Sequence, residues 1–256
     1  MLILAIETAT VEVGVAVGDG TGPLATVTAR PGRRQAETLH PAIADVCRTA
    51  RVSFAELDAL AVDIGPGLFT GLRVGVAAAK ALAAGLGLPI VTATSLDVLV
   101  AACPAGPALV VPVVDMRRGE VAWRLPDRPG EPDRAGEPDR PGEPDRPGEP
   151  DRPGGPVRVG RPVELAAELD RLEGPVLLVG DGALRHRAEL VGHGSPPPVF
   201  GGIELAAPPV ASLVVLAVKA MGDGVFSDPA AVRPFYGREA DARINWSSRQ
   251  GREAVS

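Results

Sequence analysis

The sequence predicts an α/β protein built from two related units. Apolar strands alternate with amphipathic helices, and each unit starts with a pair of strands followed by helices. This order of elements is typical of α/β folds. A glycine-rich stretch, "DIGPGLFTGLRVG" at residues 63–75, separates a strand from a helix in the first unit. With 256 residues the chain is long enough to bury a sizeable core in one domain or two small ones.

The first unit opens with a predicted β-hairpin. Residues 2–7 are apolar up to Glu7, and residues 12–20 alternate valines with small residues before a glycine turn. Residues 23–29 predict a third strand. Residues 36–50 carry apolar side chains at helical spacing and predict a helix. Ser53 and Glu56 then form a capping-box pair, which predicts a short helix after them.

The rest of the chain continues this pattern. Residues 57–65 predict a buried strand, residues 70–87 a helix, and residues 88–94 another strand. We expect Thr70 to be the N-cap of that helix and Gly85 or Gly87 to end it. The second unit is predicted as two strands around a turn near Arg118–Gly119, a helix, a strand and a further helix, at residues 108–125, 162–174, 175–183 and 208–224.

An unusual segment interrupts the second unit. Residues 126–155 repeat the motif PDRPGE five times with small variations, and they carry a net charge of −4 out of −6 for the whole chain. The segment has no apolar side chain larger than proline, so burial cannot offset the entropy of ordering it. We therefore expect a disordered surface insertion at 126–156. The predicted division is an N-terminal subdomain at 1–101, a C-terminal subdomain at 102–232 and a tail at 233–256.

Composition argues against several classes of function. No basic stripe is present, so direct binding of nucleic acid by this chain alone is disfavoured. Cys47 and Cys103 lie far apart without metal-binding spacing. No run of 18 uncharged apolar residues occurs, and the N-terminus lacks the basic start of a signal peptide. We expect a cytoplasmic protein without a membrane span.

The glycine-rich stretch allows two interpretations. Its glycines permit close backbone approach, and the helix after it directs amide groups toward any anion in the loop, with Arg73 in the first turn. Neither the P-loop pattern nor GxGxxG is present, so a tight strand-to-helix turn explains the stretch equally well. Glu7 and Asp63 both end apolar strands and could form a carboxylate pair.

Three segments together resemble the bacterial TsaB family. They are "ILAIETATVEVGVAV", "GPGLFTGLRVGVAAAKALA" and "TSLDVLV", all within residues 2–125, with weaker matches in "LLVGDGA" and in the tail. The resemblance implies the actin-like ATPase (ribonuclease H-like) fold, with two related subdomains around a cleft. It also implies a non-catalytic partner of TsaD, the enzyme that makes N6-threonylcarbamoyladenosine beside the anticodon of tRNAs that read codons beginning with A.

The resemblance suggests two sets of site residues. Helices at about 37–50 and 70–85 would form the surface that pairs with TsaD, or with a second copy of the chain when TsaD is absent, through Leu39, Ile43, Leu72, Gly75, Ala78, Ala79 and Leu82. The superfamily's phosphate-binding positions, together with the glycine loop, would correspond to Glu7, Thr8, Thr10, Gly65, Gly67, Thr70, Gly71 and Arg73. TsaE would bind near the TsaD junction, with ATP or ADP at the complex interface and tRNA bound only through the complex.

We expect no catalytic or metal-binding residue in this chain and no cofactor of its own. The related catalytic subunit holds a metal with an HxxxH pair, whereas His40 has no histidine three or four residues away, and His186 and His193 lie far along the chain. An alternative hypothesis is a nucleotide-binding phospho- or carbamoyl-transferase that acts on its own through the Gly65–Arg73 loop. Threonylcarbamoyl transfer by the chain alone would distinguish the two hypotheses.

Overall fold

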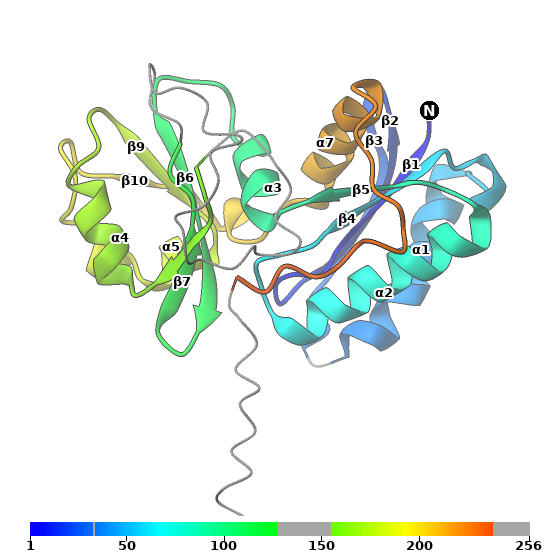
Figure 1. The fold of residues 1–256 in the computed structure, drawn as a ribbon, viewed down its shortest axis with the longest axis horizontal. Helices are drawn as coiled ribbons and strands as arrows, with labels where there is room; N and C mark the ends of the chain where they lie inside the picture. Colours follow the sequence, from blue (N-terminus) through cyan, green and yellow to red (C-terminus); the bar gives the residue numbers. More distant parts are fainter. Residues whose placement is uncertain (33, 127–154, 238–256) are drawn as a thin grey trace, which may run out of the picture.

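The structure is a computed structural model that describes residues 1–32, 34–126 and 155–237. Two five-stranded mixed sheets lie on either side of a short central helix (Figure 1). The predicted disorder of the insertion at 126–156 falls almost entirely outside the described residues. So does most of the predicted tail at 233–256.

The first sheet has the order β3-β2-β1-β4-β5. Its strands are β1 (Ile3–Glu7), β2 (Val13–Asp19), β3 (Gly22–Ala29), β4 (Ala59–Asp63) and β5 (Ile90–Ala93). Strands β1, β2 and β3 form an antiparallel meander, and β1, β4 and β5 run parallel. The predicted hairpin and third strand are therefore confirmed.

Helices cover both faces of this sheet. On one face, Leu4 and Ile6 of β1 pack with α1 (Gln35–Ala50) and α2 (Phe69–Leu86). On the other, Ile3 and Ala5 pack with α7 (Val210–Gly222). Alternate residues of a strand point to opposite faces, so a strand covered on both sides must be apolar throughout. This explains the uninterrupted apolar run of β1.

The second sheet has the order β10-β9-β6-β7-β8. Its strands are β6 (Leu109–Arg117), β7 (Glu120–Trp123), β8 (Arg158–Gly160), β9 (Val176–Val179) and β10 (Val199–Phe200). Again an antiparallel meander, β6-β7-β8, continues into parallel strands, β6-β9-β10. Read from the meander end, the strand order matches that of the first sheet, which confirms the two related α/β units.

Shorter elements complete the second unit and join it to the first. They are α4 (Pro162–Leu169), α5 (Asp181–Arg185), α6 (Arg187–Leu190) and the 3₁₀ turns Phe54–Glu56 and Ile203–Leu205. Helix α3 (Ser95–Ala101) lies between the sheets, and one hydrophobic cluster runs through its Leu96 and Leu99 into both units. The largely buried ion pair of Arg124 with Asp97 crosses the same junction.

Several predicted boundaries need correction. Helix α2 starts at Phe69 with Leu68 as its N-cap, so Thr70 is not the cap, whereas Gly87 ends the helix in a left-handed conformation as expected. Helix α4 ends at Leu169 instead of near Gly174. The division at 101/102 stays a prediction. Helix α7, however, was assigned to the C-terminal subdomain and instead packs on the first sheet.

Helix α2 also has the length and hydropathy of a membrane span, with a mean hydropathy of 1.3 over 18 residues. Seven of its residues are buried, among them Leu72, Val76 and Ala83, and α2 packs against β4 and α1. A core helix of an α/β layer has this composition because it is covered along much of its length.

Candidate functional site

The glycine loop between β4 and α2 packs on the connection between β1 and β2. A Cβ atom at Gly67 would lie 2.2 Å from the carbonyl oxygen of Ala9, and one at Gly71 would lie 2.0 Å from that of Thr8. One turn further along α2, a Cβ at Gly75 would lie 2.2 Å from Thr8 Oγ1. Real Cβ atoms do not approach oxygen so closely. Gly67 and Gly71 are therefore explained by contact with the chain's own backbone, and Gly75 by contact with the Thr8 side chain.

Hydrogen bonds hold the same two segments together. The Leu68 amide donates to the Ala9 carbonyl at 2.6 Å, and Thr8 Oγ1 donates to the Gly71 carbonyl at 2.8 Å. The Gln35 side chain of α1 donates to the Thr10 carbonyl at 2.8 Å. Thr8 and Thr10 are buried. The loop amide and hydroxyl groups named here are therefore engaged within the protein.

Glu7 and Asp63 form a buried carboxylate pair at the ends of β1 and β4. Glu7 Oε1 accepts from the Ala9 amide at 2.7 Å, and Asp63 Oδ1 accepts from the Gly65 amide at 2.7 Å and from Ser95 Oγ at 2.9 Å. Burial, and then the neighbouring Asp63, hold the pKa of Glu7 well above its usual range. Burial also raises the pKa of Asp63. Burial of two neighbouring carboxyl groups disfavours two negative charges at this place, and Glu7 Oε2 and Asp63 Oδ2 are buried without a hydrogen-bond partner.

The predicted cation of the anion loop points elsewhere. The Arg73 guanidinium stacks 3.7 Å from the ring centre of Phe69, and its Nε donates to the Tyr236 hydroxyl at 3.0 Å. Thr70 is exposed, whereas Gly65 is buried. Six of the residues predicted for the anion loop therefore lie together and pack against one another: Glu7, Thr8, Thr10, Gly65, Gly67 and Gly71. Arg73 instead contacts Phe69 and Tyr236, and Thr70 is exposed.

The residues predicted for the partner surface need correction. Leu39, Ile43, Leu72, Gly75, Ala78 and Ala79 are all buried, and only Leu82 is partly exposed. These side chains face the first sheet and the contact between α1 and α2, because that side of α2 is the one the core needs. The exposed face of α2 consists instead of Thr70, Arg73, Ala77, Ala81 and Ala84, with Phe69 at its start.

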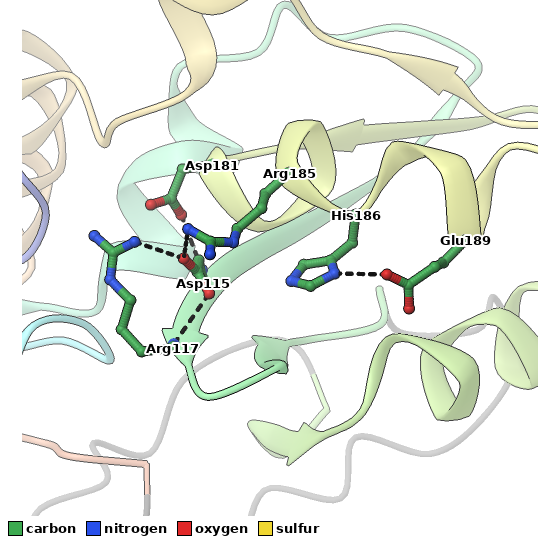
Figure 2. A network of polar contacts seen from close by, with 6 residues as sticks. All are labelled: Asp115, Arg117, Asp181, Arg185, His186 and Glu189. Atoms are coloured by element: carbon green, nitrogen blue, oxygen red, sulfur yellow. Dashed lines mark hydrogen bonds and ion pairs between the residues drawn. The ribbon is translucent and has the colours of Figure 1, made fainter.

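A second polar cluster occupies the equivalent place in the second unit, at the end of β6 (Figure 2). Buried Asp115 accepts from Arg117 Nη1 at 2.9 Å and pairs with Arg185 Nη1 at 3.2 Å. The Asp115 amide donates to Asp181 at 2.9 Å. Burial chiefly, with a contribution from the Asp115 charge, raises the pKa of Asp181 to about 6. The cluster links α5 to β6.

The histidines lie apart from both clusters. His186 pairs with Glu189 at 2.9 Å (Figure 2), and His193 pairs with Asp170 at 3.0 Å. Among the described residues, no group of three or more His, Cys, Asp and Glu side chains is arranged to hold a metal ion. Sequence reasoning missed α3 and its Ser95, although Thr94 and Asp97 form a capping box that signals a helix start.

The duplicated strand order, with paired polar residues at the end of the first strand of each unit, defines an actin-like ATPase fold. A family model described as "TsaD: tRNA N6-adenosine threonylcarbamoyltransferase" matches residues 27–128. The N-terminal part of the chain is thus similar to the family that groups TsaD with the TsaB (YeaZ) proteins.

Individual relatives show the same similarity. The chain is 34% identical to tRNA threonylcarbamoyladenosine biosynthesis protein TsaB of Escherichia coli over 125 residues, which is 48% of this chain and 54% of that protein. It is 32% identical to TsaB of Bacillus subtilis over 121 residues, 47% of this chain and 53% of that protein. The chain thus spans about half the length of these curated relatives. YeaZ of Pseudomonas aeruginosa shares the fold, with a TM-score of 0.70, 23% identity, and coverage of 92% and 99%.

Proposed function

We propose that this chain is a TsaB-type subunit that pairs with a TsaD-type enzyme and supports threonylcarbamoyl transfer to N6 of the adenosine beside the anticodon of tRNA. The observation that carries the proposal is the sequence similarity to TsaB together with a YeaZ fold across nearly the whole chain. In this proposal the chain contributes no catalytic group. It stabilises the active arrangement of its partner, which requires only that it bind that arrangement more tightly than others.

The internal packing of the glycine loop supports a scaffold over an enzyme. The Leu68 amide is bonded to Ala9, the Gly65 amide is bonded to Asp63, and the two buried carboxyl groups face each other. A nucleotide phosphate at this loop would have to displace these contacts. The alternative, an independent transferase using the Gly65–Arg73 loop, is therefore the less favoured reading.

We place the partner surface on the exposed face of α2. Ala77, Ala81 and Ala84 recur at helical spacing and leave a smooth surface that another helix can approach closely. A TsaD-type subunit would cover this face in the complex, and a second copy of this chain could cover it otherwise. TsaE and ATP or ADP would bind near that junction, and tRNA would be contacted through the complex, which we expect in the cytoplasm.

Co-expression with the TsaD of the same organism, followed by sizing and a tRNA modification assay, tests the proposal. We expect a heterodimer that modifies tRNA, while this chain alone does not. Robust transfer by the chain without TsaD would overturn the scaffold role.

A pair of matched variants tests the surface. Ala81→Arg introduces a large charged side chain on the exposed face of α2 and should weaken pairing by at least about tenfold, since a buried unpaired charge costs more than 1.4 kcal/mol. Ala167→Arg changes an exposed alanine of α4 in the second unit and should leave pairing unchanged. Both variants should keep the melting temperature of the parent. Equal pairing by both would remove this face of α2 from the interface.

A further inference from the structure

Residues 227–237, the C-terminal strap, cross from the first sheet toward the second unit. At its start, Ser227 exchanges backbone hydrogen bonds with Ile90 of β5. Further along, Lys80 Nζ of α2 donates to the carbonyl oxygens of Ala230 and Val232, at 3.2 and 2.9 Å. One side chain of α2 is therefore bound to two points of the strap.

The strap then enters the glycine loop. The Phe235 amide donates to the Ile64 carbonyl at 2.7 Å, and the Phe235 side chain is buried. Gly65 has a φ of +108°, and a Cβ there would lie 2.4 Å from the Phe235 carbonyl oxygen. Gly65 is thus needed both for its own backbone conformation and for the close approach of the strap.

The end of the strap contacts both units. A Cβ at Gly237 would lie 3.2 Å from Val159 of the second unit, 3.4 Å from Met116 of β6 and 3.4 Å from Pro66 of the glycine loop. Val232 and Phe235 also belong to the hydrophobic cluster that runs through both units. A displacement of the strap would therefore change contacts on the first sheet, on α2 and on the second sheet at once.

Tyr236 connects the strap to the start of α2. Its ring lies 4.9 Å from that of Phe69, and its hydroxyl accepts from Arg73 Nε. Phe69, Arg73 and Lys80 follow one another at intervals of four and seven residues, so they lie on the same side of α2. The strap thus runs along one edge of the exposed alanine face.

We propose that the C-terminal strap is a latch that holds the first half of α2 in the position required for pairing across its exposed face. The claim that pairing requires the closed latch rests on the proposed function, whereas the claim that the strap holds α2 in position does not. The strap contains no helix or strand and is held by few backbone hydrogen bonds, so it can open without unfolding the sheets. If pairing requires the closed latch, pairing must in turn protect the strap, since coupling between two sites is reciprocal.

Hydrogen exchange of the isolated full-length chain tests the latch. Tyr236→Ala removes the stack on Phe69 and the acceptor of Arg73, and it changes a residue that is not fully buried, so the fold should survive. We expect amides of residues 71–80 to exchange at least about tenfold faster than in the parent. Phe235→Ala should produce a larger increase. Phe226→Ala changes an exposed aromatic residue just before the strap and should have no effect on α2.

Parent-like exchange of residues 71–80 in both Tyr236→Ala and Phe235→Ala would refute the latch. If Phe235→Ala does not fold, the exchange of residues 71–80 in Tyr236→Ala alone decides whether the latch exists. With TsaD bound, the parent strap should exchange more slowly, and Tyr236→Ala should pair at least about tenfold more weakly. Failure of the parent to pair would refute the proposed function, and the exchange of the isolated chain would still decide the latch.

Discussion

Replacement of Gly75 by alanine tests whether the glycines of this region serve internal packing. The new Cβ would lie 2.2 Å from Thr8 Oγ1, which is buried and bonded to the Gly71 carbonyl. Overpacking costs about 1–3 kcal/mol, and displacement of the hydroxyl costs about 1 kcal/mol more. Alanine recovers about 1 kcal/mol through its higher helix propensity. We expect a net loss of about 1–3 kcal/mol of unfolding free energy.

The clash involves one atom, Thr8 Oγ1, so a substitution that removes this atom should abolish or reverse the destabilising effect of Gly75→Ala. In a Thr8→Ala background the nearest atoms to the new Cβ would be the Cβ of residue 8 at 3.4 Å and Ile6 at 3.5 Å, both ordinary contacts. There Gly75→Ala should be neutral or stabilising by up to about 1 kcal/mol, and the two substitutions should couple by about 1–4 kcal/mol.

Denaturant titration of the parent, the two single variants and the double variant measures this double-mutant cycle, provided that the slope of unfolding free energy against denaturant concentration is the same in all four. Gly85→Ala is the matched control, because a Cβ at Gly85 of the same helix meets nothing within 4 Å. It should stabilise the chain by about 0.5–1 kcal/mol. If Gly75→Ala is as well tolerated as Gly85→Ala, or if Thr8→Ala does not relieve it, the packing explanation is wrong.

Three further outcomes follow from buried polar groups. The pKa of Glu7 is raised in the folded chain, so its contribution to the free energy of unfolding is fully present below about pH 4.3 and is lost as the pH rises through the folded pKa. In denaturant titrations, the unfolding free energy of Glu7→Gln should therefore depend less on pH than that of the parent. Asp181 has a folded pKa of about 6 against about 3.9 unfolded, so the free energy of unfolding should fall by about 2 kcal/mol as the pH rises from 4 to 7. Asp181→Asn keeps the acceptor for the Asp115 amide and should abolish that loss in the same titration. Trp123→Ala removes a buried ring that donates to Glu168, and calorimetry should show a loss of about 3–5 kcal/mol.

The sequence predicted those parts of the fold that depend on local pattern. The β1–β2 hairpin, the strand-turn-helix around the glycine loop and the duplicated order all follow from periodicity and turn residues. The buried side of α2 could not be predicted, because Ala78 and Ala79 differ in no chemical property from Ala77 and Ala81. Only the position of the sheet decides which alanines face inward. The N-cap was missed for a related reason, since Leu68 caps α2 without a side-chain hydrogen bond.

Long-range packing was outside the reach of sequence reasoning. The glycine motif indicated close approach, but nothing local showed that the approaching groups are Ala9, Thr8 and Phe235. The proximity of Glu7 and Asp63 was predicted from their places at strand ends, whereas their burial was not. Nothing in the sequence of the tail indicated that Phe235 would enter a loop that lies more than 160 positions earlier in the chain.

The position of α7 has a consequence for how the chain folds during its synthesis. The face of the first sheet that carries Ile3, Ala5 and Ala61 is completed only by residues 210–222. Until the ribosome has released that helix, an apolar sheet surface made within the first 100 residues has no cover. The N-terminal half therefore cannot finish folding first, as the leading domain of a modular protein does. Both halves must mature together, and a nascent chain halted between them would expose a surface prone to aggregation.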